Sequence, residues 1–180
     1  MKSLYIITVI VAITFLSCKS ASSKVTDEQI KALETLVENK NFTIESNWAF
    51  PRTTAAMQRV LNSGMLPSGS STGAINLIGN SNFLTISGDS ITSYLPYYGE
   101  RYTNVAYGGT DGPIQLKGVV ENYTVSKGKQ HSYIISFDAK TKSERFNISM
   151  TLYPSLKSYV KLLGNSRSPI SYSGHVEDSD

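Results

Sequence analysis

Cysteine is almost absent from this 180-residue sequence, and histidine is scarce. The single cysteine, Cys18, cannot form a disulfide within the chain, which excludes a disulfide-stapled fold. The two histidines, His131 and His175, form no helical pair, and no run of alternating aspartates marks a calcium loop. The glycine-rich loops that hold phosphates are missing as well. The sequence therefore predicts no metal site and no cofactor.

The N-terminal segment has the pattern of a secretory signal. Lys2 precedes a mostly apolar run, residues 4–16, which falls short of the roughly 20 residues that a membrane-spanning helix needs. Cys18 follows residues 15–17, Phe-Leu-Ser, and this run resembles a bacterial lipobox with Phe15 at the position where leucine is usual. The resemblance implies that the Cys18 thiol receives a diacylglyceryl group and that cleavage removes residues before it. The alternative is an ordinary cleavable signal that happens to contain a cysteine.

Lipidation at Cys18 would by itself attach the protein to a membrane. Each buried methylene contributes about 0.8 kcal/mol, so two or three acyl chains anchor a protein stably. Residues 18–25 would then be the lipidated cysteine and a flexible tether. In such bacteria, an acidic cluster soon after the lipidated cysteine would be a signal for export to the cell surface. No acidic residue follows Cys18 before Asp27, which favours the periplasmic face of the outer membrane over surface display. We therefore expect a lipid-anchored protein of the bacterial cell envelope.

Charge is low and nearly balanced. The sequence has 17 Lys and Arg against 14 Asp and Glu, and removal of the signal, residues 1–17, takes away one lysine and leaves a balance of +2. This balance argues against a nucleic-acid partner. Charged residues are only 17% of the chain, whereas Ser, Thr, Asn, Gly and Tyr are common, which favours strands and turns. Residues 26–177 fit one β-rich domain, with 178–180 as a tail.

One helix is predicted at the start of this domain. Thr26 and Gln29 have the spacing of a capping box, and acidic residues follow the cap. Ile30, Leu33 and Val37 recur on one face. Because this apolar stripe is narrow, we expect the helix to pack against a sheet or to close the end of a barrel.

The remainder of the domain predicts antiparallel strands. Residues 133–137 and 146–152 alternate apolar and polar side chains, a period of two that is typical of half-buried strands. Short turns predict a meander, and eight or nine strands are enough for a barrel-like domain or a sandwich, with closure favoured because it removes exposed edges. The predicted strands cover residues 42–50, 74–78, 83–87, 91–95, 123–126, 132–139, 145–153, 158–163 and 170–176.

Two further structural features are predicted for the first half of the domain. Phe42, Ile44 and Trp48 are predicted to point inward from the first strand. A short helix is predicted within residues 53–63, ended by Gly64.

The densest run of distinctive residues is 88–100, Gly-Asp-Ser-Ile-Thr-Ser-Tyr-Leu-Pro-Tyr-Tyr-Gly-Glu. A turn leads into a short strand, and Pro96 ends regular pairing because it lacks a backbone donor. Together with residues 123–125 and 170–174, this run resembles a family of small Bacteroidetes envelope lipoproteins known as domain of unknown function 4251. The likeness covers roughly residues 25–176. No catalytic residues are established for that family, so the resemblance assigns none.

Catalysis has one weak candidate. Ser71 lies in a Gly-x-Ser-x-Gly pattern, residues 69–73, which works as a hydrolase elbow only between a strand and a helix. Neither element is predicted there. His131 is expected in a hairpin turn and His175 at an outward strand position, which suits solvated surface histidines. A serine hydrolase that uses Ser71 with one histidine is the alternative to a non-catalytic protein.

Two further candidates lie in or near the distinctive run. Ser90 follows Asp89 and precedes an aliphatic residue, which resembles the Bacteroidetes sequon for protein O-glycosylation. Five clustered tyrosines would either stack on sugar rings or line an apolar pocket mouth, or else complete the core. We therefore expect a non-catalytic binding or structural module for an apolar or glycan ligand or for an envelope protein. The tyrosines are Tyr94, Tyr97, Tyr98, Tyr102 and Tyr107.

Overall fold

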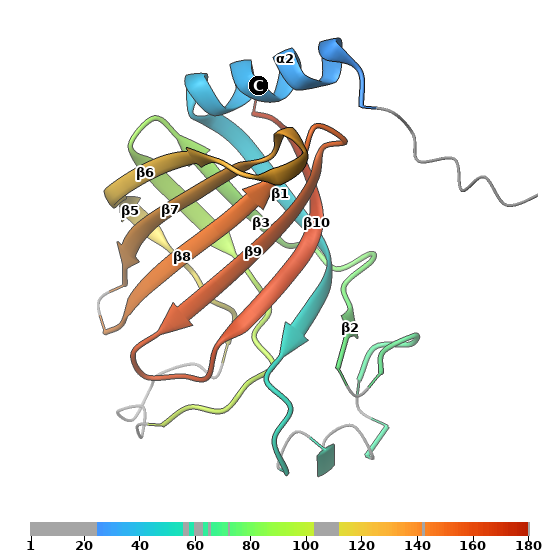
Figure 1. Cartoon of the computed structure of the whole chain (residues 1–180). Helices are drawn as coiled ribbons and strands as arrows, with labels where there is room; N and C mark the ends of the chain where they lie inside the picture. Colours follow the sequence, from blue (N-terminus) through green and yellow to red (C-terminus); the bar gives the residue numbers. More distant parts are fainter. Residues whose placement is uncertain are drawn as a thin grey trace, which may run out of the picture.

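The described strands of this protein form one antiparallel sheet that curls into a nearly closed barrel, with a helix at its N-terminal side (Figure 1). The computed structural model describes residues 25–55, 58–59, 63–64, 66–71, 73–102, 112–141 and 143–179. In this part of the chain the main elements are α2 (Asp27–Asn39), β1 (Asn41–Pro51), β2 (Ile75–Asn76), β3 (Phe83–Ser87), β4 (Ser90–Tyr94), β5 (Lys117–Val119), β6 (Glu121–Lys127), the 3-10 turn η1 (Lys129–His131), β7 (Tyr133–Lys140), β8 (Arg145–Leu152), β9 (Lys157–Gly164) and β10 (Ile170–Asp178).

The order of the strands brings the two edges of the sheet together. Nine of the described strands follow the path β5-β4-β3-β1-β10-β9-β8-β7-β6, and β2 pairs with β1 beside this path. The outermost strands, β5 and β6, are consecutive in the chain and are separated only by Val120. The backbone therefore joins the two edges, and the predicted barrel-like meander is confirmed, with β5 as a short strand that sequence reasoning missed.

The interior of the barrel is filled by apolar side chains. The alternation predicted for the C-terminal strands is confirmed, because Ile135, Phe137, Ile148 and Met150 are all buried. At about 25 cal/mol per Å² of buried apolar surface, these side chains are the main source of stability. The largest fully buried side chains are Tyr172, Phe42, Phe137, Phe146, Leu33, Ile44, Ile75, Leu77, Leu84, Ile86, Ile91 and Leu95.

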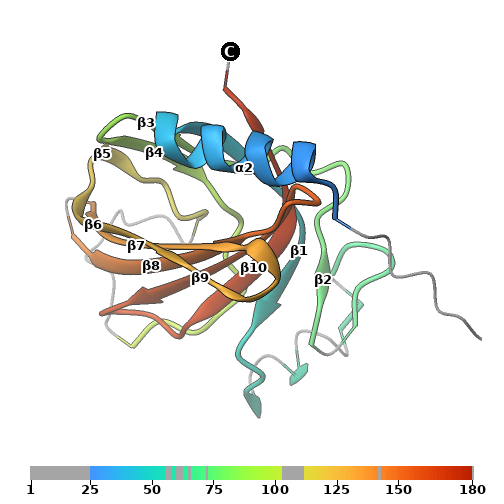
Figure 2. The same cartoon turned by 45° about the horizontal axis from the view of Figure 1, so that its top comes forward.

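Helix α2 lies across one end of the barrel (Figures 1 and 2). The predicted capping box is present: the Gln29 amide donates to Thr26 Oγ1 at 3.3 Å, and the Thr26 amide donates to Gln29 Oε1 at 3.0 Å. Leu33, Leu36 and Val37 are buried against the barrel end. The predicted stripe is thus correct at Leu33 and Val37, while Leu36 is buried in place of the partly exposed Ile30. No helix among the described residues is long and apolar enough to span a bilayer.

The prediction that Trp48 points inward is wrong. A β-bulge interrupts the pairing of β1 with β10 between Ser46 and Trp48, so that Asn47 is an extra residue. The bulge reverses the alternation, because one inserted residue moves every later side chain to the other face. Ala49 is consequently the buried residue, and Trp48 lies on the outer face.

Residues 53–63 are described only in part. Ala55, Gln58 and Arg59 are helical, and the Gln58 amide donates to the Thr54 carbonyl at 3.0 Å, as expected for a short helix. Gly64 has a φ of +69°, the left-handed conformation that commonly ends a helix. Residues 56–57 and 60–62 of this prediction lie outside the described residues.

Candidate functional site

The tyrosine cluster lies where β4 leaves the sheet. Leu95 still exchanges backbone hydrogen bonds with Ile114, but Pro96 has no amide to continue the ladder. Its carbonyl instead accepts a hydrogen bond of 2.7 Å from the hydroxyl of Tyr172, a buried residue of β10. The chain is therefore held against the barrel at the point where the consecutive tyrosines begin.

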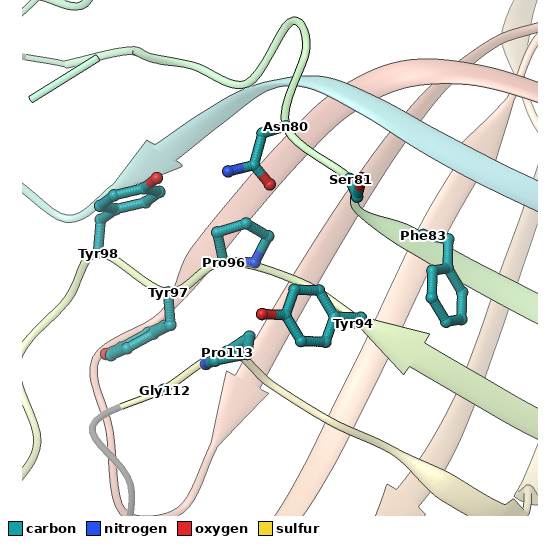
Figure 3. Close-up of a pocket in the computed structure, with 9 residues that line it drawn as sticks. All are labelled: Asn80, Ser81, Phe83, Tyr94, Pro96, Tyr97, Tyr98, Gly112 and Pro113. Carbon is teal, nitrogen blue, oxygen red and sulfur yellow. The ribbon is translucent and has the colours of Figure 1, made fainter.

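An open groove of about 610 Å³ adjoins this exit point (Figure 3). Tyr94 and Phe83 are directly opposite each other on β4 and β3, and the two residues are 41% and 40% exposed. Figure 3 shows the Tyr94 hydroxyl and the Asn80 amide turned toward Pro96 from opposite sides. The lining residues are Asn80, Ser81, Phe83, Tyr94, Pro96, Tyr97, Tyr98, Gly112 and Pro113.

Tyr97, which lines this groove, is held in place by a network of hydrogen bonds. Its hydroxyl lies 2.9 Å from the Glu100 carbonyl, 3.0 Å from the Ser168 carbonyl and 3.0 Å from Ser168 Oγ. The Glu100 amide donates to the same Ser168 hydroxyl at 3.1 Å. Burial raises the pKa of Tyr97, and the hydrogen bond from Ser168 and the nearby charge of Arg167 offset this only in part. Tyr97 is therefore a neutral anchor for the loop.

Gly99 is required by this anchor. A Cβ at this position would lie 2.6 Å from Cζ of Tyr97, closer than Cβ atoms approach other side chains. The glycine of the distinctive run thus leaves room for the Tyr97 ring.

A buried ion pair lies behind Tyr97. The Arg167 guanidinium is 4.6 Å from the centroid of the Tyr97 ring and 5.2 Å from that of Phe146. Arg167 donates to both carboxylate oxygens of Glu144, with Nε at 3.0 and 2.9 Å and Nη2 at 2.6 Å. Arg167 Nη1 is buried without a hydrogen-bond partner among the described residues. Sequence reasoning missed both charged residues, because a pair 23 positions apart in two connecting loops leaves no local pattern.

The structure separates the predicted tyrosines into different environments. Tyr94, Tyr97 and Tyr98 line the groove, and burial raises the pKa of Tyr98. Tyr102 is exposed and does not line it. Tyr107 lies outside the described residues, as does Cys18.

The three residues of the predicted hydrolase site lie in different segments of the fold. The Ser71 amide donates to the Ala74 carbonyl at 2.8 Å, and β2 follows, whereas an elbow needs a helix there. His131 is exposed in η1, the predicted hairpin turn. His175 lies on β10, with Nε2 3.9 Å from a carboxylate oxygen of Glu45.

Two other predicted features can be placed. Ser90 is the exposed first residue of β4, next to the exposed Asp89, whose carboxylate accepts a hydrogen bond of 3.2 Å from Lys40. Within the described residues, no group of three or more His, Cys, Asp or Glu side chains is arranged to hold a metal ion.

Comparison with known proteins gives the family of this chain. A family described as Domain of unknown function (DUF4251) matches residues 24–176. The crystal structure of a DUF4251 family protein from Bacteroides eggerthii DSM 20697 has the same fold, with a TM-score of 0.56 and 16% identity over 84% of this chain and 88% of that chain. No curated protein matches the sequence. The chain therefore belongs to the DUF4251 family, which is a family of unknown function.

Proposed function

We propose that this protein is a lipid-anchored, non-catalytic binding module of the bacterial cell envelope, and that its groove beside β4 binds a glycan. The observation that carries this proposal is the exposed ring pair of Tyr94 and Phe83 on adjacent strands, with the Asn80 amide lining the same groove (Figure 3).

The chemistry of the groove favours a sugar over a fully apolar ligand. Aromatic faces pack against the C–H faces of a pyranose, while tyrosine hydroxyls and an amide supply hydrogen bonds to its hydroxyl groups. A volume of about 610 Å³ is in the range of small-ligand sites. The barrel interior is filled by residues such as Phe42, Phe137 and Met150, so a ligand is accommodated at the surface.

The support of the groove is rigid, which suits binding. Tyr94 and Phe83 stand on paired strands, and Tyr97 and Pro96 are fixed by hydrogen bonds to Ser168 and to Tyr172 of β10. Rigid aromatic side chains lose little conformational entropy when a ligand binds. The site therefore has the features of a preformed binding surface.

The envelope part of the proposal depends on Cys18. Acyl chains on this residue would hold the domain at the periplasmic face of the outer membrane through the tether of residues 18–25. The exposure of Ser90 supports its proposed O-glycosylation, since a modifying enzyme can reach it. No residue of the groove, and neither histidine, is assigned a catalytic role.

The test is mass spectrometry of the protein extracted gently from its own membrane. The denatured mass is expected to include acyl chains on Cys18 and a sugar increment on Ser90. The native mass is expected to include a further non-covalent glycan that denaturation removes. Absence of acylation would refute the anchor, and a native mass equal to that of the modified chain would refute a tightly held ligand.

Variants locate the ligand. We expect Tyr94→Ala to lose the non-covalent mass, because it removes one of the two exposed rings. Tyr102→Ala is the matched control, since Tyr102 is exposed but does not line the groove. Retention of the ligand by Tyr94→Ala would place it elsewhere, and an added mass that proves to be a protein would favour an envelope partner instead.

A further inference from the structure

A second groove lies along the outer face of β1, β10 and β9. Its volume is about 840 Å³, and its walls include Trp48, Tyr159 and Ser173. These three residues are in register across the sheet, because Trp48 pairs with Ser173 and Ser173 pairs with Tyr159. One row of the sheet therefore places a small hydroxyl residue between two large aromatic residues.

The bulge in β1 brings Trp48, the single tryptophan of the chain, to this row. Gly174 faces the bulge, and a Cβ there would lie 2.7 Å from Cα of Ser46 and still closer to the Glu45 carbonyl oxygen. Ser46 Oγ is buried without a partner among the described residues. The fold thus accepts an unsatisfied hydroxyl and an obligatory glycine to keep the bulge, and bulges often re-aim a side chain at a site.

The spacing in this row suits one six-membered sugar ring. Adjacent strands are about 4.8 Å apart, so the backbones that hold Trp48 and Tyr159 are about 10 Å apart. Ser173 between them is too small to fill the gap. A pyranose held midway would lie about 5 Å from each aromatic ring, within the range of centroid distances for stacked rings, so both of its faces would be covered.

The rim of the groove supplies polar groups with little net charge. His175 and Lys157 are paired across β10 and β9, and both line the groove. Glu45 borders the groove without lining it: it pairs with His175 on the other side, with its carboxylate 3.9 Å from Nε2. One lysine and one carboxylate balance each other, which favours a neutral ligand over an anion.

From this geometry we infer that the groove is a second carbohydrate site, in which a neutral pyranose ring is held between Trp48 and Tyr159. It is separate from the groove beside β4, since the two have no lining residue in common among the described residues. This inference stands or falls without the proposed function of that first groove. Two sites on one anchored domain would allow it to hold a polysaccharide at two points.

The fluorescence of Trp48 gives a direct test, because the full chain has no other tryptophan. The anchored protein in a detergent without a sugar headgroup is titrated with cellotetraose, chitotetraose and xylotetraose. Sorbitol is the control ligand, since it has hydroxyl groups but no ring. We expect a saturable change in intensity or emission maximum with at least one oligosaccharide and none with sorbitol.

The variants distinguish the two grooves. We expect Tyr159→Ala to weaken the saturable response about tenfold, as loss of one aromatic contact predicts. Lys161→Ala, on the outer face of β9 but outside the groove, is the matched control and should bind normally. Tyr94→Ala should also leave the response unchanged. The inference is refuted if no oligosaccharide gives saturation up to about 10 mM, if Tyr159→Ala binds as wild type does, or if Tyr94→Ala alone removes the response.

Discussion

Replacement of Arg167 by methionine should destabilise the domain strongly. The change removes the cation and all three hydrogen bonds to Glu144, and the Glu144 side chain is only 3% exposed. A buried carboxylate without its partner costs about 3–5 kcal/mol. For a domain of this size, that corresponds to a fall in melting temperature of roughly 6–20 °C.

Three measurements of unfolding separate the buried charge from other causes. Urea denaturation of Arg167→Met gives the loss in free energy. The double variant Arg167→Met/Glu144→Leu should recover to within about 2 kcal/mol of wild type, because a pair of apolar side chains tolerates burial. Arg145→Met is the surface control, since its side chain is 60% exposed and its contact with Glu121 is long at 4.0 Å; little change is expected there.

Loss of Arg167 should also affect the groove. Arg167 packs against the Tyr97 ring, so its loss should loosen the loop that Tyr97 anchors and raise hydrogen exchange at the Glu100 amide. A loss below about 1 kcal/mol in the single variant, or a double variant as unstable as the single one, would refute this account.

Other predictions concern single contacts. Tyr123→Phe should stabilise the protein by about 1 kcal/mol in urea denaturation, because the Tyr123 hydroxyl is buried without a partner among the described residues; Tyr172→Phe should destabilise it by about 1–3 kcal/mol, because the Pro96 carbonyl loses its donor. Burial raises the pKa of Tyr123 to about 12, so wild type should lose stability as pH rises from about 10 toward 12, and a phenylalanine variant that shows the same alkaline loss would contradict this. Gly174→Ala should cost about 3 kcal/mol or more and shift the tryptophan emission, because a Cβ there collides with the bulge; normal stability and emission would show that the bulge tolerates a side chain. Thr26→Ala should cost about 1 kcal/mol through loss of the helix cap, and unchanged thermal melting would show that α2 contributes little to global stability.

Local patterns in the sequence account for much of the fold. Strand β3 has the predicted bounds, and β8 and β10 differ from prediction by one or two residues at one end. Each of these strands buries one face, so the positions of its apolar residues in the sequence indicate where the strand lies. Strand β5 was missed because its three residues are all exposed and show no alternation.

Bulges and long-range contacts are outside the reach of such patterns. The alternation of β1 alone places Trp48 inside, and only its pairing with β10 shows the extra residue at Asn47. The tyrosines of the groove were predicted as a cluster because they are near neighbours in the chain. Phe83 was not predicted with them, since the pairing of β3 with β4 is what brings it to Tyr94, and Asn80 joins the groove from the loop before β3.

The distinctive run of residues 88–100 contains, within a few positions, residues that anchor a loop and a residue that is exposed in the groove. Tyr97 and Gly99 hold the loop against the barrel, whereas Tyr94 presents an exposed ring to the groove. A substitution at Tyr97 would therefore change binding and stability together, because it removes the anchor as well as one wall. Tyr94 can be changed without loss of an anchoring hydrogen bond among those described. Variants that keep the melting temperature and change only binding should therefore be sought at Tyr94 and at Phe83 opposite it. If substitution of Tyr97 alone weakened ligand binding, the cause would be the altered fold and not the loss of a direct contact.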